Sequence, residues 1–319
     1  MSTYFVRRLL LFIPTLLIVS MLVFLSVRLL PGDFVDMLLS DPQYGATDVD
    51  RERFREMLGL NVPAHIAYVQ WMRGILLEGT LGKSLLRGHR PVEGKILDRM
   101  PVTLELGLAA LIIGLSIALP VGIYSAVRQD TVGDYAGRGV AIFGLATPNF
   151  WLALMVLIFP GIWWGWTPPL RLFDFSEDPL AHVGMFLIPG LIMGTGLSAA
   201  TMRMTRTTML EVLRQDYVRT AWAKGLRERV VVVRHALKNA LIPVVTLIGL
   251  QLPILVGGSV IVETLFNLPG LGSLLVQALS LRDYPMVSGI NLFFATFILF
   301  ANLLIDLLYA YLDPRIRYQ

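Results

Sequence analysis

The sequence of 319 residues has no cysteine, only four histidines and a charged fraction of only 16%. The lack of cysteine excludes a disulfide framework, an iron–sulfur cluster and a thiol nucleophile. The histidines form no H-E-x-x-H pair, and no G-x-S-x-G turn occurs, so the patterns of zinc peptidases and serine hydrolases are missing. Soluble domains carry about 25% charged residues, so the low charge also argues against a soluble protein.

The chain is rich in apolar sequence, arranged in long blocks. Hydrophobic residues make up 55% of it, and the mean hydropathy is +0.66. The blocks run to roughly 20 residues, the length that crosses the hydrocarbon core of a bilayer as a helix. The net charge of +4 is explained by basic residues in cytoplasmic loops rather than by nucleic-acid binding. We therefore expect an all-α polytopic membrane protein whose partners include membrane lipid and no nucleic acid.

Six stretches are expected to be transmembrane helices, because a spanning segment must pair its backbone N–H and C=O groups internally. They are Leu9–Leu30, Val102–Val127, Val140–Gly161, Val183–Ala200, Ala240–Val262 and Ser288–Leu312. The first is longer than a signal-peptide core and no A-x-A site follows it. We interpret residues 1–30 as an N-terminal cytoplasmic end and a retained first span. The second to fifth spans contain proline, which kinks a helix.

The Lys and Arg residues of the short loops predict that both termini are cytoplasmic. Residues 31–101 would then form an extracytoplasmic insertion, a small helical cap on the membrane domain. In it, Asp48–Leu60 and Ala64–Leu77 have helical spacing, and glycines up to Gly94 predict turns after them. Residues 102–319 would form the core domain, with five spans and a cytoplasmic loop at residues 201–239.

Two short features invite other interpretations. Leu81-Gly82-Lys83-Ser84 is similar to the end of a phosphate-binding loop, but Leu77 stands where that loop needs its first glycine. We therefore expect no nucleotide site there. Asp306 lies at membrane depth, with Asn302 one turn before it. A carboxylate at that depth suggests function, so an interhelical hydrogen-bonded pair and a proton or ion relay both remain open.

The most informative segment is the loop of residues 201–239, which holds nine Lys or Arg residues. Within it, Gln215–Gly225 is typical of a short helix ended by a glycine cap, with Lys224 beside its C-terminus. This helix carries apolar and aromatic side chains that a solvated basic loop does not need: Tyr217, Ala221, Trp222 and Ala223. They indicate a docking surface for a partner protein.

The stretch Asp216–Leu226, D-Y-V-R-T-A-W-A-K-G-L, resembles the EAA coupling loop of ABC importer permeases, EAA-x3-G-x9-I-x-LP. Ala221 and Gly225 match this motif, whereas Arg219 and Thr220 replace its Glu and first Ala. Further on, H-A-L-K replaces I-x-LP and retains only the leucine. These departures are typical of the dipeptide/oligopeptide/nickel subfamily.

The resemblance to that subfamily extends along nearly the whole chain. The similar motifs include Arg7-Arg8-Leu9-Leu10, Leu30-Pro31-Gly32-Asp33, Arg99-Met100-Pro101-Val102-Thr103-Leu104, Thr147-Pro148-Asn149-Phe150-Trp151, Arg282-Asp283-Tyr284-Pro285 and Leu312-Asp313-Pro314-Arg315. Any one of these short motifs is weak evidence, whereas their common order and spacing are specific.

The resemblance implies a type I ABC importer permease with six transmembrane helices, in a bacterial or archaeal cytoplasmic membrane. Its partners would be a second homologous permease subunit, two cytoplasmic ATPase subunits that bind ATP and magnesium, and an extracytoplasmic substrate-binding protein. This chain would form half of the translocation pathway and would itself be non-catalytic, with no cofactor or metal. Peptides are the expected substrate; nickel chelates, glutathione and sugars are others that the family moves.

The same resemblance assigns coupling to the ATPase to one set of residues, all in the loop. They are Asp216, Tyr217, Arg219, Thr220, Ala221, Ala223, Lys224, Gly225 and Leu226.

Two other classes of function are alternatives to an importer subunit. An ion-coupled secondary transporter would use Asp306 and no ATPase, and such proteins often show inverted repeats with broken helices; no repeat is visible in the sequence. A membrane enzyme would need a cluster of polar catalytic groups at membrane depth, and the sequence offers none. An ATP-driven importer needs no proton relay, which favours a structural role for Asp306.

Overall fold

The structure, a computed structural model, describes the backbone of residues 2–29, 61–85, 90–169 and 171–312. Within these ranges the chain is helical apart from turns and one isolated bridge between Lys83 and Pro91. The predicted all-α class is confirmed.

The chain folds into two compact units. One holds Thr103–Leu268 together with the stretch that begins at Ala301, and the other holds Ser2–Val102 and Pro269–Phe300.

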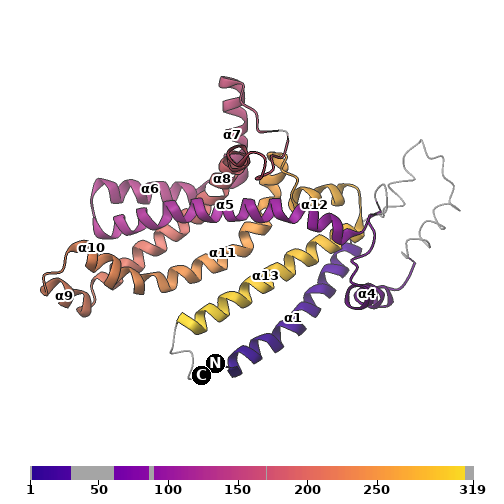
Figure 1. Cartoon of the computed structure of the whole chain (residues 1–319), viewed down its shortest axis with the longest axis horizontal. Helices are drawn as coiled ribbons and strands as arrows, with labels where there is room; N and C mark the ends of the chain where they lie inside the picture. Colours follow the sequence, from indigo (N-terminus) through magenta and orange to yellow (C-terminus); the bar gives the residue numbers. More distant parts are fainter. Residues whose placement is uncertain (1, 30–60, 86–89, 170, 313–319) are drawn as a thin grey trace. The chain divides into compact units, whose positions relative to one another are not determined.

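The long helices correspond to the predicted spans. In chain order (Figure 1) they are α1 Ser2–Arg28, α5 Val92–Val127, α6 Val132–Ala146 with α7 Asn149–Trp164, α8 Pro179–Leu213, α11 Lys238–Leu265 and α13 Tyr284–Leu312. By length and composition, five helical stretches among the described residues are suited to cross a membrane, and a bent helix pair raises the number to six if it is one span. The predicted multi-pass architecture is thereby confirmed.

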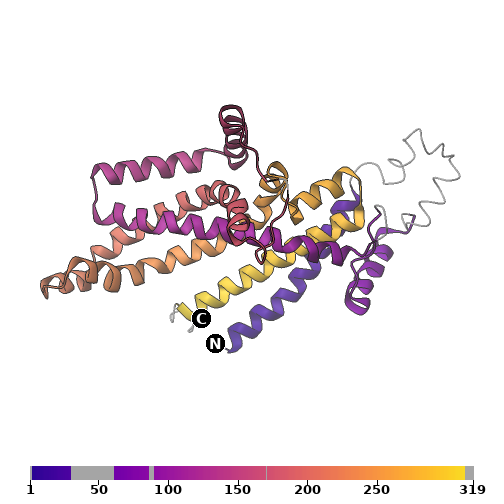
Figure 2. The same ribbon diagram turned by 45° about the horizontal axis from the view of Figure 1, so that its top comes forward.

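The third span is broken, whereas the sequence predicted one kinked helix over Val140–Gly161. Its two halves, α6 and α7, meet at an angle of 96° (Figure 2). The residue before a proline is pushed out of the helical region by the proline ring. Thr147, which precedes Pro148, accordingly adopts φ −92° and ψ 120°. The effect of Pro148 is therefore a sharp bend between two helices rather than a kink within one.

Between α8 and α11 the chain is mostly helical, so the prediction of a loop over residues 201–239 is wrong for its two ends. α8 continues to Leu213, and residues 201–213 contain neither glycine nor proline to stop it. α9 Asp216–Ala223 and α10 Glu228–Val230 follow, and the π-helix η2 Val231–Leu237 leads directly into α11. Figures 1 and 2 show α9 at the point where α8 ends and the helix formed by α10, η2 and α11 begins.

In the second unit, a short helical segment packs beside the first span. α4 Ala64–Arg73 and the π-helix η1 Gly74–Glu78 confirm the predicted helix over Ala64–Leu77. The hydroxyls of Ser20 in α1 and Tyr68 in α4 are hydrogen-bonded at 2.8 Å. The rings of Phe24 and Tyr68 lie edge to face, 5.6 Å apart.

Of the other predictions for this unit, one is untested and one is wrong. The predicted helix over Asp48–Leu60 lies outside the described residues. Gly94 was expected in a turn, but it lies near the start of α5, which begins at Val92. The sequence also missed α12 Leu271–Ser280, a ten-residue helix between α11 and α13.

The segment that is similar to a phosphate-binding loop has another role in the structure. Ser84, whose hydroxyl such a loop would offer to its ligand, is fully buried. This hydroxyl donates a hydrogen bond to the carboxylate of Asp283, and the backbone N–H of Leu85 donates to the same carboxylate at 3.1 Å. Ser84 and Leu85 therefore tie this segment to the residues just before α13.

In the first unit, α5 and α8 approach closely where both carry glycine. A Cβ atom placed on Gly194 of α8 would lie 2.8 Å from the backbone oxygen of Ala110 and 3.2 Å from the backbone nitrogen of Gly114 in α5. Only glycine fits at such a distance between backbones, as in other membrane helix pairs. At Gly190, one turn earlier in α8, an added Cβ atom would lie 3.1 Å from the Cβ of Ala109 in α5.

This contact predicts that Gly194→Ala destabilises the protein, because the added methyl group forces the two backbones apart. We expect a loss of about 1–3 kcal/mol, the usual cost of overpacking, and a lower midpoint of thermal unfolding in detergent. The control is Gly184→Ala in the same helix, where an added Cβ would meet no atom within 4 Å. Equal midpoints for the two variants would refute the close approach.

Candidate functional site

The helix α9, Asp216–Ala223, lies within the predicted stretch Gln215–Gly225 and has the predicted glycine after its end. Gln215 precedes it in an extended conformation, and Asp216 lies in its first turn, where a carboxylate interacts favourably with the helix dipole. The helix ends at Ala223, and the N–H of Gly225 donates to the carbonyl of Trp222 at 2.9 Å. Gly225 has φ +73°, the left-handed conformation that glycine adopts readily after a helix.

One side of α9 is buried against the helices that flank it. Val218 and Ala221 are 0% and 4% exposed, and they form an apolar cluster with Val231, the first residue of η2. Leu226 is half-buried and packs against the same cluster. The spacing of three residues between Val218 and Ala221 places both on one face of the helix.

The other side of α9 is open, and we call it the α9 face. It consists of the exposed residues Asp216, Tyr217, Arg219, Thr220, Trp222, Ala223, Lys224 and Gly225.

Two large aromatic side chains stand out on the α9 face. Tyr217 is 43% exposed and Trp222 is 44% exposed. Tyr217 is held in place by a hydrogen bond of 2.7 Å that the amide of Asn239 donates to its hydroxyl. Exposed aromatic rings on a short, fixed helix are the kind of anchor that dominates protein–protein contacts.

The structure thus divides the nine residues that the coupling motif indicated. Seven of them lie on the α9 face, whereas Ala221 lies beneath the helix and Leu226 at its edge. Ala221 is therefore placed to hold α9 against η2 rather than to touch a partner. Trp222 was outside the set given by the motif, but its aromatic side chain was among those that indicated a docking surface, and its ring is exposed.

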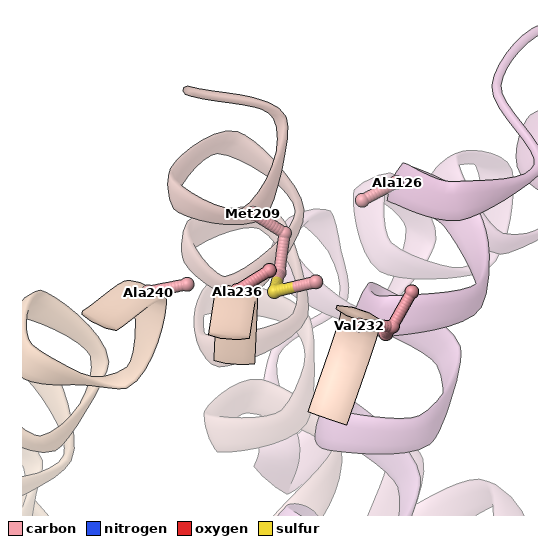
Figure 3. Packing of buried hydrophobic residues seen from close by; sticks show 5 residues of the cluster. All are labelled: Ala126, Met209, Val232, Ala236 and Ala240. Atoms are coloured by element: carbon pink, nitrogen blue, oxygen red, sulfur yellow. The ribbon is translucent and has the colours of Figure 1, made fainter. Parts of the chain in front are cut away.

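A second apolar cluster connects η2 to the long helices. It joins Ala126 of α5, Met209 of α8, Val232 and Ala236 of η2, and Ala240 of α11. Figure 3 shows the side chain of Met209 pointing toward Ala236 and Val232. Val231 contacts α9 and Val232 contacts this cluster, so η2 touches both α9 and α8. The end of α8 also packs directly on the α9 cluster through Val212 and Leu213.

A buried ion pair that no sequence motif indicated lies near the start of α6. Asp134 is fully buried, and its carboxylate accepts two hydrogen bonds from Arg206 of α8, at 2.9 and 3.0 Å. Ser125 of α5 donates its hydroxyl to the same carboxylate. Residue 134 lies outside the predicted third span, which began at Val140, whereas α6 begins at Val132.

The turn between α5 and α6 also meets the segment after α9. A guanidinium nitrogen of Arg128 lies 3.2 Å from the carboxylate of Glu228, at the start of α10. Both side chains are about half exposed, so this ion pair contributes little stability. It does place the α5–α6 turn beside α10.

Two further ionisable side chains come from the spans. Glu105 of α5 lies 3.2 Å from the ring nitrogen Nε2 of His182 and is partly exposed. Asp306 lies in α13, and its side chain is outside the part of the chain that the structure describes.

Together these features define a multi-pass membrane protein with an ordered helical segment between two of its spans. The chain belongs to the binding-protein-dependent transport systems, as an inner membrane component: that family's sequence profile matches residues 118–318, and the profile of the N-terminal region of such membrane components matches residues 1–107.

Several relatives match over their full length. The chain is 38% identical over 320 residues to the oligopeptide transport system permease protein AppB of Bacillus subtilis, with 100% of each chain covered. It is 37% identical over 348 residues to the dipeptide transport system permease protein DppB of Escherichia coli, also with 100% of each covered. A putative peptide permease protein of Brucella ovis is 40% identical over 322 residues, with 99% of each covered. The permease family that the motifs indicated is therefore confirmed.

Two solved structures share the fold. One is an amino acid ABC transporter, with a TM-score of 0.53 and 14% identity over 68% of this chain and 94% of the other. The second is the MetNI methionine ABC transporter, with a TM-score of 0.52 and 17% identity over 69% of this chain and 97% of the other. At these identities the likeness concerns the fold alone.

The cap of α9 leads to a prediction about Gly225. Gly225→Pro fixes φ near −65° where the structure has +73°, and it removes the N–H that bonds to Trp222. A strain of about 1–3 kcal/mol opens the segment about 5- to 150-fold more often, since 1.4 kcal/mol is a factor of ten. We expect tryptic cleavage after Arg219 to accelerate accordingly in the detergent-solubilised protein; the bond after Lys224 is not followed, because trypsin does not cleave before proline.

The matched control is Gly225→Asn, because asparagine tolerates the left-handed conformation better than other non-glycine residues. This variant should be cleaved at close to the unmodified rate. Cleavage of both variants at the same rate would show that the cap does not hold α9.

Proposed function

We propose that this chain is the permease subunit of an ATP-driven, binding-protein-dependent peptide importer, and that the α9 face docks on a cytoplasmic ATPase subunit. The observation that carries this proposal is the form of α9: a short capped helix, fixed from below by apolar contacts and exposing Tyr217 and Trp222. Full-length similarity to oligopeptide and dipeptide permeases supports the transport role and the peptide substrate.

The proposed complex contains further chains. A second homologous permease would supply the other half of the pathway, two ATPase subunits would bind ATP and magnesium, and an extracytoplasmic protein would deliver the substrate. This chain would then be non-catalytic. The basic residues between α8 and α11 support a cytoplasmic location for α9 and, with it, for both termini.

The substrate is proposed from the relatives. AppB and DppB are named for oligopeptides and dipeptides, so peptides are the first choice. Nickel chelates, glutathione and sugars, which the family also moves, remain the candidates if peptides fail. Substrate choice would rest largely with the binding protein.

The coupling can be described as a shift between two conformations. ATP binding would close the ATPase pair and carry α9 with it. The ATPases must bind the inward- and outward-facing arrangements of the permease with different affinity, because a partner with equal affinity for both transmits nothing. Val218 and Ala221 hold α9 on η2, and Val212 and Leu213 of α8 pack on the same cluster, so a displacement of α9 would be passed both to η2 and to the end of α8.

The ion-coupled alternative, with Asp306 as the carrier, has no support in the family match. An importer driven by ATP needs no carboxylate relay, and the ordered α9 would have no purpose in a transporter without an ATPase.

The decisive experiment is purification of the tagged chain from native membranes in mild detergent, with mass spectrometry of the proteins that accompany it. We expect a second permease and two P-loop ATPases. Recovery of the chain alone, or as a homomer, would overturn the proposal and make Asp306 the first residue to examine.

A second experiment locates the contact. Because the chain has no cysteine, Ala223→Cys gives a single site for a thiol-reactive photo-cross-linker. We expect a covalent adduct with an ATPase subunit. Ala221→Cys is the control, since residue 221 is 4% exposed and should neither label nor cross-link. Adducts only with lipid or within the chain would place the ATPase elsewhere.

A further inference from the structure

The ion pair between Asp134 and Arg206, in the first unit, is oriented by several hydrogen bonds. The two hydrogen bonds from Arg206 reach both oxygens of one carboxylate, a bidentate arrangement that fixes direction as well as distance. The backbone N–H of Asp130 donates to Asp134 at 3.1 Å, and Arg138 lies 3.4 Å from it. With the hydroxyl of Ser125, three elements converge on this carboxylate: α5, the α5–α6 turn and α8.

The surrounding contacts between α6 and α8 are apolar and small. Ala141 of α6 packs with Ala199 and Met202 of α8 and with Ala118 of α5. Such contacts give no direction and would allow α6 to slide or rotate on α8. A buried bidentate ion pair has one good geometry, and fixing register is the best-attested use of buried polar pairs. The Asp134–Arg206 pair is therefore what makes the start of α6 follow α8.

The pair lies close to the path from α9. Met209, which receives the contacts of η2, follows Arg206 by three residues, nearly one turn of the same helix. In addition, Arg128 in the α5–α6 turn forms an ion pair with Glu228 at the start of α10, the helix that follows α9. A movement of η2 would thus be passed to α8 at Met209, within one turn of Arg206, which binds Asp134 of α6.

On the far side of the pair lies the broken span. Asp134 is in the first turn of α6, and the other end of α6 is the 96° bend that leads to α7. A displacement at the start of α6 is carried by a rigid helix to this bend, where the backbone has already left the helical conformation. The bent pair is the element of the bundle best suited to change its shape.

We propose that Asp134 and Arg206 are positioning residues that transmit the movement of α9 to the broken span α6–α7, so that their ion pair is required for ATP hydrolysis to be converted into transport. The proposal rests on the proposed docking of α9 to an ATPase. Neither residue touches a substrate in this scheme; the pair acts by keeping α6 in register with α8.

The test uses the complete complex in proteoliposomes, with binding protein and a mixture of alanine peptides of two to five residues as the probe. Arg206→Lys keeps the charge but loses the bidentate geometry. We expect the variant to retain its ATPase subunits and its unstimulated ATP hydrolysis within about twofold, while the number of peptides imported per ATP falls about tenfold, the size of a typical coupling.

A second variant covers the possibility that Arg206→Lys misfolds. The double change Asp134→Leu with Arg206→Met replaces the pair by apolar side chains, and such replacements of buried pairs are often neutral for stability. It should assemble and hydrolyse ATP, and it should be as uncoupled as Arg206→Lys. The control is Arg171→Lys, which alters an ion pair with Glu177 at 3.7 Å whose side chains are both 70% exposed, and it should import normally.

The outcomes separate this inference from the proposed function. If the unmodified complex contains no ATPase, the proposed function fails first. If it contains ATPases and the double variant imports as many peptides per ATP as the unmodified protein, the ion pair serves stability alone and the inference is wrong. Equal loss of hydrolysis and import in the assembled double variant would also overturn it, because the pair would then act on the ATPases rather than on the spans.

Discussion

The hydrocarbon of a bilayer offers no water to the backbone, so each peptide N–H and C=O of a span must find its partner within the protein. This constraint makes the spans of this permease helices and makes an interruption costly. At the break between α6 and α7, nearby residues satisfy this requirement for backbone pairing. Pro148 has no N–H to pair, and the N–H and the hydroxyl of Thr147 both donate to the carbonyl of Phe143. At the bend of 96°, the donors of Thr147 are therefore paired within the protein.

Once the helices are given, their packing depends on two kinds of contact. Where α5 crosses α8, Gly114 and Gly194 let the backbones touch. Contact of this kind is close, but it does little to fix the orientation of one helix on the other. At the start of α6, the Asp134–Arg206 pair adds direction, because a carboxylate and a guanidinium bind well in one orientation only. Around α9, apolar contacts at Val218 and Ala221 hold a helix whose other side remains open. The permease thus combines a tightly packed bundle with an exposed helix linked to it through η2.

Much of this was visible in the sequence, for identifiable reasons. The spans follow from blocks of apolar residues, and α9 follows from Asp216 at its start and Gly225 after its end, because these signals act within one turn of the helix. The bend at Pro148 and the helical extension of α8 to Leu213 were misjudged. A proline allows either a kink or a break, and neighbouring helices decide which. The end of α8 was placed where hydropathy falls, although a helix continues wherever its residues permit.

The sequence by itself determined that this chain is an all-helical membrane permease and that α9 forms between two of its spans, since hydropathy, helix caps and motif order are local properties. Only the tertiary structure decided which side of α9 is open, that Ala221 lies beneath it, and that Asp134 meets Arg206, 72 positions away in the chain. Contacts between residues so distant in sequence depend on how helices pack, and packing is set by the fit of all the neighbouring side chains together.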